Sequence, residues 1–399
     1  MKIIFFIGIR SASFSAAYVR ISSFIKVFEA EGHNVYAIST YSPRSLSKMG
    51  LRIKEGMEIY NLCLVLWAEN IFSLLFNILS SFVVSFLLLS LFRPKVVIIS
   101  VPSGEPAVGA YLAAKLIRAK VFFDIRDEWE DYVISKASSK TFKGAYKLLK
   151  ALMTSLYNKG DLVVAVTQPI ARSLRLRGVR RVEVIPNGAD INVFRPYEKN
   201  TVRGRLGLKD DEFVLVYEGG VGGYYRLDVV VRALTRLDDT VRNKIRLVVI
   251  GSGDIPNLLK LAENLGLKDN VIYLGVKNDK AELAQIISAG DIGLIPYDDN
   301  PLWKNSVPAK FYEYCACGIP VIATVHDDSY LEELIKKYEI GVTSPPLDEE
   351  KLAEAIYWLY KNKSFREVAG KKARQLIEEK FDRNKIAEEY LNLIKEMMK

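Results

Sequence analysis

The sequence predicts an α/β protein built from two doubly wound, Rossmann-like domains in tandem, which face a central cleft. Short runs of β-branched and other apolar residues alternate with helix-length segments along most of the chain. This pattern is typical of parallel sheets that are covered on both faces. A chain of 399 residues is also too long for one ordinary core, so two domains are expected.

The strand-like runs fall into two series, one in each half of the chain. The first series comprises residues 2–8, 34–40, 95–101, 120–125, 162–167 and 182–187. The second series comprises residues 213–219, 245–253, 270–275, 291–297 and 320–324. Between them, residues 192–212 are polar and punctuated by proline and glycine, as expected of a domain boundary. We predict an N-terminal domain over 1–195, a second domain over 205–375, and a C-terminal helix within 376–399 that crosses back to the first domain.

Composition limits the function classes. Three cysteines form no disulfide framework, which fits a reducing compartment, and only His33 and His326 are available for a zinc site or a histidine-based triad. The formal net charge is +9, and the segment from Lys136 to Arg181 holds eleven Lys or Arg residues against one acid. Such a segment indicates an anionic partner (a membrane, a nucleic acid or a phosphate-bearing substrate) or a solvated basic face.

Glycines follow the first strand of the second domain, in the stretch YEGGVGGYYRLD. Gly219, Gly220, Gly222 and Gly223 predict a flexible turn ahead of a helix that begins near Arg226. Such a turn lets the backbone approach a ligand, and a helix N-terminus favours an anion such as a diphosphate; tight turns also use glycine without any ligand. The spacing is not GxGxxG and no acid ends the next strand, which argues against a nicotinamide-cofactor oxidoreductase.

The stretch NSVPAKFYEYCACGIPVIAT, residues 305–324, predicts a short helix over 307–317. Ser306 is the expected N-cap, Pro308 suits the first turn, and Gly318 is the expected stop.

Lys310 and Glu313 share one face of this helix, because they lie three residues apart. A lysine in the first turn opposes the helix dipole and is a poor structural choice there. A phosphate near the N-terminus would reverse this argument, since the helix amides and Lys310 would both bind it. Glu313 could then accept hydrogen bonds from the vicinal hydroxyls of a sugar. The alternative is a simple Lys310–Glu313 ion pair.

Several motifs together resemble the GT-B glycosyltransferases of family 4, also called glycosyl transferases group 1. They are PAKFYEYCACGIPVIA, DLVVAVTQPIARSLRLRGVRRVEVIPNGADINVFRP, IGSGD, NVIYLG and ISAGDIGLIPY. The segment SVPSGEPAVGAYLAAKLIRAKVFFDIRDEW is similar to a subgroup that builds surface polysaccharides and lipid-linked glycans. The resemblance implies a GT-B fold and retaining transfer of a sugar from a UDP- or GDP-sugar to a lipid-linked or cell-surface glycan. It implies no cofactor and no bound metal.

The resemblance also implies roles for individual residues. It places Glu313 on the donor ribose and Gly275 and Val276 against the base. Lys310 and Arg226 are our candidates for stabilising the leaving diphosphate. The expected donor-binding set is Gly219, Gly220, Gly222, Gly223, Arg226, Gly251, Gly275, Val276, Pro308, Lys310 and Glu313.

The chain departs from the family pattern in two places. A glutamate is common eight residues before Glu313, where this chain has Asn305. A usual arginine and lysine after the first donor-domain strand are replaced by Gly220 and Tyr225. These departures leave open a nucleotide-sugar-binding protein with lost or altered catalysis.

An acidic cluster, DIRDEWED, follows a strand of the N-terminal domain. Asp124, Asp127, Glu128, Glu130 and Asp131 could hold a magnesium or manganese ion through oxygen ligands. We favour a different role, in which Asp127 faces the acceptor and orients or deprotonates its hydroxyl. Together with Lys310 and Glu313, Asp127 completes the expected catalytic set.

Two segments suggest a membrane surface. Residues 71–92 carry no charge, and a helix of that length, about 33 Å, could cross a bilayer. Crossing is awkward, because the strands on both sides belong to one expected sheet; the helix either dips into lipid or is buried. Five lysines recur at helical spacing and form a basic stripe for anionic headgroups. They are Lys136, Lys140, Lys143, Lys147 and Lys150. Few aromatic residues interleave with these bases, which disfavours nucleic acid. We expect a cytoplasmic protein, held peripherally at the inner face of the cell membrane.

Overall fold

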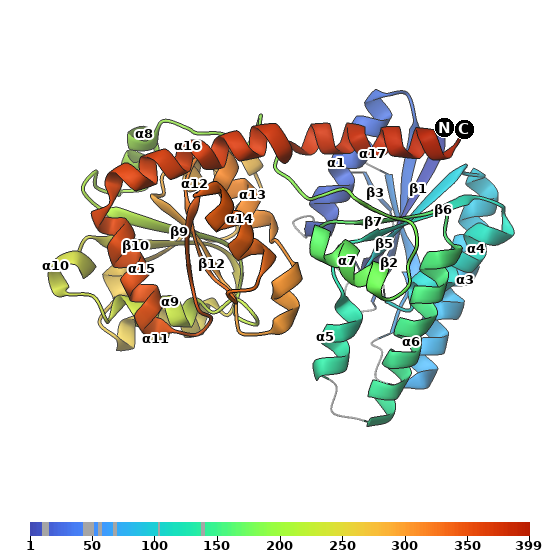
Figure 1. The fold of residues 1–399 in the computed structure, drawn as a ribbon, viewed down its shortest axis with the longest axis horizontal. Helices are drawn as coiled ribbons and strands as arrows, with labels where there is room; N and C mark the ends of the chain where they lie inside the picture. The colour runs from blue at the N-terminus through green and yellow to red at the C-terminus, as the bar shows by residue number, and fades with distance from the viewer. Residues whose placement is uncertain (10–15, 43–51, 55–57, 67–69, 103, 137–139) are drawn as a thin grey trace. The chain divides into compact units, whose positions relative to one another are not determined.

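The computed structural model describes residues 1–9, 16–42, 52–54, 58–66, 70–102, 104–136 and 140–399. It divides the chain into two compact units: unit 1 comprises Met1–Asn187 and Asn384–Lys399, and unit 2 comprises Gly188–Arg383. Each unit has one mainly or wholly parallel sheet with helices on both faces (Figure 1). The predicted α/β class with two doubly wound domains is confirmed.

Unit 1 has an eight-stranded sheet in the order β3-β4-β2-β1-β5-β6-β7-β8. The strands are β1 (Lys2–Ile9), β2 (Asn34–Tyr41), β3 (Arg52–Lys54), β4 (Glu58–Leu64), β5 (Val96–Val101), β6 (Lys120–Ile125), β7 (Leu162–Ala165) and β8 (Val182–Val184). All neighbours pair in parallel except β3 and β4, which are antiparallel. These two strands were not predicted, because RIK and EIYNLCL lack a continuous β-branched apolar run.

The helices of this unit cover both faces of its sheet. They are α1 (Ala16–Ala30), α3 (Ile71–Phe92), α4 (Pro106–Leu116), α5 (Trp129–Lys136), α6 (Lys140–Lys159), α7 (Gln168–Leu176) and α17 (Arg383–Met397). Helices α1 and α17 (Figure 1) share one core with β1. Within this core the rings of Phe24 and Tyr390 lie 5.2 Å apart. Helices α3, α4, α6 and α7 contribute to the core on the other face.

Unit 2 has a six-stranded parallel sheet in the order β11-β10-β9-β12-β13-β14. The strands are β9 (Phe213–Val221), β10 (Ile245–Gly253), β11 (Val271–Tyr273), β12 (Ile292–Pro296), β13 (Val321–Thr324) and β14 (Gly341–Ser344). Alternate residues of β9 supply the two cores: Val214 and Val216 face one side, and Leu215 and Tyr217 the other. The carboxyl end of β9 therefore stands at the centre of this domain.

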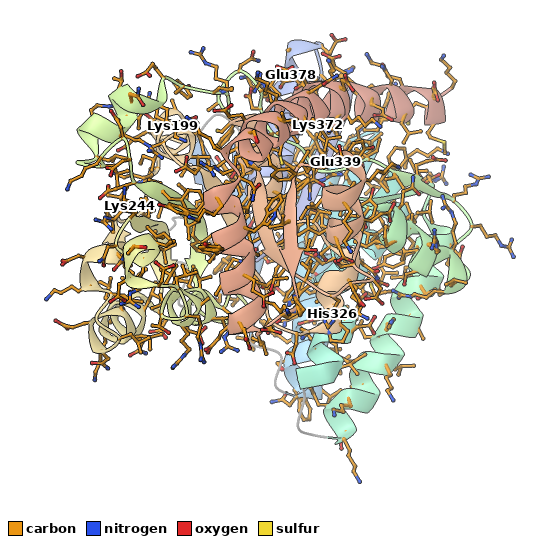
Figure 2. The ribbon with its side chains drawn as sticks, turned by 60° about the vertical axis from the view of Figure 1, so that its left-hand side comes forward. Lys199, Lys244, His326, Glu339, Lys372 and Glu378 are labelled. Atoms are coloured by element: carbon orange, nitrogen blue, oxygen red, sulfur yellow. The ribbon has the colours of Figure 1, made fainter. Side chains whose placement is uncertain are left out.

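The helices of unit 2 are α8 (Lys199–Arg205), α9 (Leu227–Leu234), α10 (Asp239–Arg242), α11 (Ile255–Asn264), α12 (Lys280–Ser288), α13 (Ala309–Ala316), α14 (Tyr330–Tyr338), α15 (Glu349–Lys361) and α16 (Lys363–Lys380). Two short 3-10 helices complete it, η1 (Lys268–Asn270) and η2 (Pro301–Asn305). Exposed ion pairs join neighbouring helices, such as Lys372 of α16 with Glu339 at the end of α14 (Figure 2).

The two histidines lie in different units. Nδ1 of His33 is 2.9 Å from the N-terminal nitrogen of Met1. His326 is labelled in Figure 2, and its Nε2 is 2.9 Å from the carbonyl oxygen of Asp299. The three cysteines are free and buried. Neither residue type is gathered into a cluster within the described ranges.

Candidate functional site

Helix α13 carries the two residues that the sequence singles out. It begins at Ala309, with Pro308 as N-cap, and ends before Gly318, whose φ of +74° is left-handed. The predicted start at residue 307 with Ser306 as N-cap is wrong, because Ser306 closes η2. The proline also disfavours the helical conformation for the residue before it, so a helix here starts later.

Lys310 is buried by aromatic rings. Only 5% of the residue is exposed, and Nζ lies 3.5 Å from the ring centroid of Tyr225 and 5.1 Å from that of Tyr217. In the part of the chain that the structure describes, this ammonium makes no hydrogen bond and no ion pair, so the simple Lys310–Glu313 pair is not observed. Burial lowers the pKa of Lys310 to about 8, and the charge of Glu218 acts in the opposite direction. An unpaired buried cation is costly, which favours an anionic ligand here.

Glu313 lies one turn further along α13 and is 3% exposed. Nη2 of Arg383 is 3.9 Å from its Oε1. Its charge also acts on the carboxyl group of Glu218 and raises the pKa of that group. The backbone N–H of Glu218 donates to the hydroxyl of Tyr314, at 2.9 Å, which ties the end of β9 to α13.

Glu218 is a member of the site that the sequence analysis missed. Burial first, and then the charge of Glu313, raise the pKa of Glu218 to about 8. This shift favours the protonated, uncharged form of the Glu218 carboxyl. The available signal was an acid at the end of the apolar run FVLVYE, directly before the glycines.

Gly219 and Gly220 do not form a free turn; they extend strand β9 and pair with the end of β10, and we call this paired extension the glycine ribbon. Strand β9 continues through Gly219 and Gly220 to Val221 and stays in register with β10, where Gly219 lies opposite Gly251. The turn itself is later and tighter, with Gly222 bridged to Tyr225 before α9 begins. The expected flexible turn from Gly219 onward is therefore corrected to this shorter one. A Cβ placed on Gly219 would lie 3.3 Å from Nζ of Lys310, so the ribbon also borders the buried ammonium.

Replacing Gly251 with alanine is expected to lower the free energy of unfolding by about 2 kcal/mol or more. Its φ is +137°, and an added Cβ would lie 1.9 Å from the carbonyl oxygen of Gly219. Gly220→Ala is the matched control, because a Cβ there meets no atom within 4 Å. Urea unfolding of both variants measures the difference. If Gly251→Ala and Gly220→Ala lose the same amount of unfolding free energy, the close approach of Gly251 to Gly219 is not what requires glycine there.

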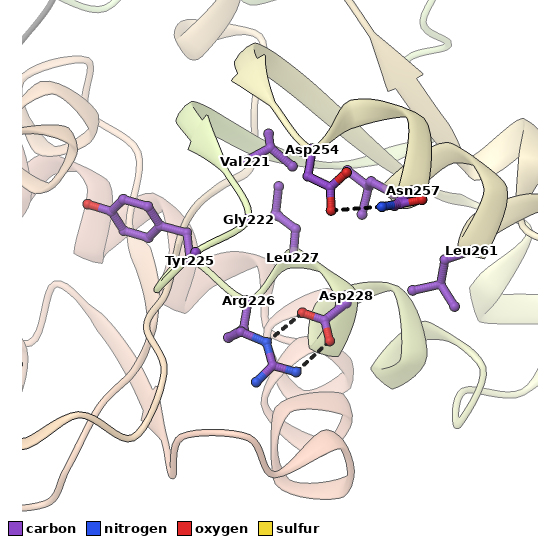
Figure 3. A pocket seen from close by; sticks show the side chains of 11 residues that line it. Val221, Gly222, Tyr225, Arg226, Leu227, Asp228, Asp254, Asn257 and Leu261 are labelled. Atoms are coloured by element: carbon purple, nitrogen blue, oxygen red, sulfur yellow. Dashed lines mark hydrogen bonds and ion pairs between the residues drawn. The ribbon is translucent and has the colours of Figure 1, made fainter. Parts of the chain in front are cut away.

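A cavity of 340 Å³ lies beside the turn and contains part of the predicted donor set (Figure 3). Gly222, Gly223 and Arg226 line it, together with Asp228 and Asp254. Two guanidinium nitrogens of Arg226 donate to the carboxylate of Asp228 at 2.8 and 2.6 Å, and this partner raises the pKa of Arg226 (Figure 3). Lys310 and Glu313 do not line this cavity. Arg226 is therefore already engaged, and Lys310 is the stronger phosphate candidate.

Gly275 and Val276 follow β11 near the tip of β10. The N–H of Gly251 donates to the carbonyl oxygen of Gly275 at 2.9 Å, and Val276 is largely exposed. Three members of the predicted donor set thus lie at the carboxyl edge of the sheet, as expected for a ligand site in a doubly wound domain.

The acidic residues that the sequence places in one cluster of unit 1 pair with different basic side chains. Asp124 is buried in a two-pronged pair with Arg20, whose Nη2 lies 2.9 Å from Oδ1, and Asp131 pairs with Lys150 at 2.5 Å. Among the described residues no group of His, Cys, Asp and Glu could hold a metal ion. Asp127 lies two residues after the end of β6 and is half-buried. It belongs to unit 1, whereas Lys310 and Glu313 belong to unit 2.

Helix α3 has inverted polarity: its polar side chains are buried against its own domain and its large apolar side chains are exposed. Its small polar residues recur every four positions and are buried against unit 1: Ser73, Asn77, Ser81 and Ser85. Its large apolar side chains are exposed: Ile71, Phe72, Leu75, Phe76, Leu79, Val83, Phe86, Leu87 and Leu91. Amphipathic helices of water-soluble domains show the opposite arrangement. Helix α3 is therefore not the plain buried helix that the sequence left as one alternative.

Close contacts hold α3 on its domain. The side-chain amide of Asn77 donates to the carbonyl of Leu66 at 2.9 Å and to Glu105 at 2.5 Å. A Cβ on Gly109 of α4 would lie 2.2 Å from Oγ of Ser81, so the two helices touch at small residues. Small and polar residues also mediate helix packing inside membranes. Helices α3 and α4 are therefore packed against each other (Figure 1).

The predicted basic stripe does not lie on one helix, because Lys136 ends α5 while the other four lysines belong to α6. Lys140 and Lys147 are exposed and Lys143 is half-buried. Lys150 is the one of these that pairs with Asp131. The side chain of Lys136 lies outside the described residues.

Two family models match most of the chain between them. The model of Glycosyltransferase Family 4 matches residues 19–193, and that of Glycosyl transferases group 1 matches residues 198–376. The chain is 28% identical over 221 residues to an uncharacterised glycosyltransferase of Methanocaldococcus jannaschii, 54% of each protein. It is 36% identical over 152 residues to a D-inositol 3-phosphate glycosyltransferase of Stackebrandtia nassauensis, 36% of this chain and 33% of that one. The matches span about half or less of these relatives.

Solved structures of other proteins resemble the whole chain, among them the following two. Sucrose-phosphate synthase from Thermosynechococcus elongatus matches with a TM-score of 0.77 and 18% identity, covering 100% of this chain and 99% of that one. Anabaena HepE in complex with UDP and glucose matches with a TM-score of 0.72 and 16% identity, covering 99% of each. At this identity the likeness shows a common fold.

Proposed function

The chain belongs to the GT-B glycosyltransferases of family 4, the glycosyl transferases group 1, and on this basis we propose that it transfers a sugar from a nucleotide sugar to an acceptor hydroxyl. The family expected from PAKFYEYCACGIPVIA and its companion motifs is confirmed. The activity, the donor and the acceptor are proposals.

The buried ammonium of Lys310 is the observation that carries the donor site. It lies against Tyr225 and Tyr217 at the end of β9, beside the glycine ribbon. A diphosphate would give this cation the direct ion pair that it lacks among the described residues, and negative charge grows on the diphosphate as the glycosidic bond breaks. Glu313 would accept hydrogen bonds from the donor ribose. A UDP-sugar is the first donor to test, because HepE is described in complex with UDP and glucose.

We propose a retaining and metal-independent reaction, as the family resemblance implies. Lys310 would supply the positive charge that a metal ion supplies in other transferases. Asp127 would orient or deprotonate the acceptor hydroxyl.

We also propose that unit 1 binds the cytoplasmic face of the membrane, where the acceptor is a lipid-linked or cell-surface glycan. Helix α3 would lie in the plane of the membrane with its apolar face in lipid. Strands β4 and β5, which flank α3, belong to one sheet, and this favours lying on the bilayer over crossing it. Lys140 and Lys147 of α6 would meet anionic headgroups and contribute roughly 1 kcal/mol each.

The runner-up is a nucleotide-sugar-binding protein without turnover. Asn305 motivates it, because the family often has a glutamate at that position. Both proposals predict donor binding, and only the first predicts acceptor-dependent release of nucleoside diphosphate.

The test is nucleoside diphosphate release from UDP-, GDP- and ADP-sugars, with and without anionic vesicles that carry prenyl-phosphate acceptors. Release from one donor that requires the acceptor, and that is lost in Glu313→Ala, would support the transferase. Tight nucleotide binding without release would favour the runner-up. Absence of both would contradict the two proposals.

A further inference from the structure

Lys310 lies at one end of a group of four aromatic side chains, which we call the aromatic stack. Its Nζ is 3.5 Å from the ring centroid of Tyr225. The ring of Tyr225 is stacked on that of Tyr297, with centroids 5.2 Å apart and 15° between the planes. Tyr297 is in turn stacked on Trp303, at 5.0 Å and 5°. The fourth ring, that of Tyr224, lies 4.6 Å from the ring of Tyr225 and 4.5 Å from that of Trp303, so it packs on both.

Three segments of unit 2 assemble the aromatic stack. Tyr224 and Tyr225 belong to the turn after β9. Tyr297 follows β12, and Trp303 belongs to η2, which leads into α13. Hydrogen bonds join these segments: the backbone N–H of Asp298 donates to the carbonyl oxygen of Tyr224 at 2.9 Å, and the indole N–H of Trp303 donates to the carboxylate of Asp298. The aromatic stack is therefore held at the carboxyl edge of the sheet, where doubly wound domains bind ligands.

Tyr224 is the exposed member of the aromatic stack. It is 38% exposed, whereas Tyr297 and Trp303 are buried and Tyr225 is half-buried. Because two neighbouring rings and a backbone hydrogen bond already hold Tyr224, a ligand that covers this ring needs to order little of the protein. An exposed and pre-positioned ring is a suitable wall for a small-molecule site.

We propose that the exposed ring of Tyr224 is the platform on which the sugar of the donor packs, and that Tyr224 is a specificity-determining residue for that sugar. This inference rests on the proposed donor site and adds the sugar subsite to it. The ammonium of Lys310 and the ring of Tyr224 both contact the ring of Tyr225, so they are close neighbours. With the diphosphate at Lys310, the sugar is the part of the donor that extends from the phosphate to Tyr224.

The chemistry of a pyranose suits this ring. A pyranose has hydroxyl groups on its rim and C–H groups on its faces, and these C–H groups carry a small positive partial charge. The face of an aromatic ring is apolar and negative, so it attracts them while their hydroxyls remain at the edge of the contact. The expected class of donor sugar is therefore a hexopyranose whose C–H groups gather on one face, as in glucose or galactose.

Substitutions of Tyr224 separate the sugar from the diphosphate, because a nucleoside diphosphate lacks the sugar that its glucose derivative carries. Tyr224→Ala should weaken binding of the sugar nucleotide about tenfold and leave the nucleoside diphosphate within about twofold of wild type. Tyr224→Leu keeps apolar bulk against Tyr225 and Trp303 and should show the same selective loss. Tyr224→Phe keeps the ring and should bind both ligands as wild type does. Tyr357→Ala is the matched control, at a tyrosine of α15 that is 40% exposed, and it should change neither affinity.

The experiment is calorimetric titration of UDP, GDP and ADP, each alone and as its glucose derivative, and of UDP-galactose into the intact protein and its variants. Thermal unfolding verifies that each variant is folded. A loss confined to the sugar nucleotide in Tyr224→Ala and Tyr224→Leu, with Tyr224→Phe unaffected, supports the proposal.

Equal losses for the sugar nucleotide and the bare diphosphate, or no loss for either, overturn the proposal and leave the diphosphate site intact. Wild-type protein that binds a nucleoside diphosphate but none of these sugar nucleotides also overturns it. An inability of the wild-type protein to bind any of the nucleotides overturns the donor site and the proposal together.

Discussion

Lys310→Met is expected to weaken nucleoside diphosphate binding by about 30-fold or more and, at the same time, to raise the thermal stability of the empty protein. The ammonium is buried against Tyr225 and Tyr217 and has no ion pair in the described part of the chain. Methionine has a similar length and packs well on aromatic rings. The substitution therefore removes a buried charge that has no ion pair among the described residues, and it also removes the stronger of the two proposed phosphate ligands from the diphosphate.

A substitution that weakens nucleotide binding but raises thermal stability identifies a lysine that serves the ligand, whereas a lysine with a structural role would lower stability when replaced. Lys304→Met is the control, because Lys304 precedes the same helix but pairs with Asp328 at the surface, at 2.7 Å. Calorimetry and thermal unfolding on both variants measure the effect. A Lys310→Met protein that is less stable than wild type and binds nucleotide normally would assign Lys310 a packing role instead.

Replacing Leu79 and Leu87 together with lysine is expected to reduce binding to anionic vesicles at least tenfold, even though the net charge becomes more positive. These side chains are 61% and 63% exposed on α3, so the fold should tolerate the change. Taking two lysines into the apolar part of the bilayer costs on the order of 1–3 kcal/mol each. Vesicle co-sedimentation measures the bound fraction.

The control for this result is Leu259→Lys, which makes the same substitution at an exposed leucine of α11 in unit 2. It should leave vesicle binding unchanged. Undiminished binding of the α3 variant would mean that the apolar face of α3 does not enter lipid, and that the lysines of α6 act alone.

Much of the fold was predictable because parallel sheets leave a strong local pattern. Runs such as KVVIISV and FVLVYEG have apolar side chains on both faces, and each became a central strand. Strand β14, GVTS, was missed because it is short and half polar. The inverted polarity of α3 could not be derived either, since a serine stripe fits a buried face or an exposed face equally well until its neighbours are known.

The site was predictable only where sequence neighbours define it. Lys310 and Glu313 share α13, and their spacing was enough to select them. The ring of Tyr225 under the ammonium, and the carboxyl of Glu218 beside Glu313, come from β9 and its turn some ninety residues earlier. No periodicity connects segments so far apart. Asp124 shows the converse: an acidic run suggested an ion, and a distant arginine, Arg20, proved to be its partner.

The central claim is that α13 and the end of β9 bind the diphosphate of a nucleotide sugar. Calorimetric titration of UDP, GDP and ADP into the wild-type protein and into Glu313→Ala at pH 7 tests it most directly. We expect one nucleotide to bind the wild-type protein and Glu313→Ala to lose that binding while remaining folded. If all three nucleotides fail to bind the folded wild-type protein, or if Glu313→Ala binds as tightly as wild type, the claim is wrong.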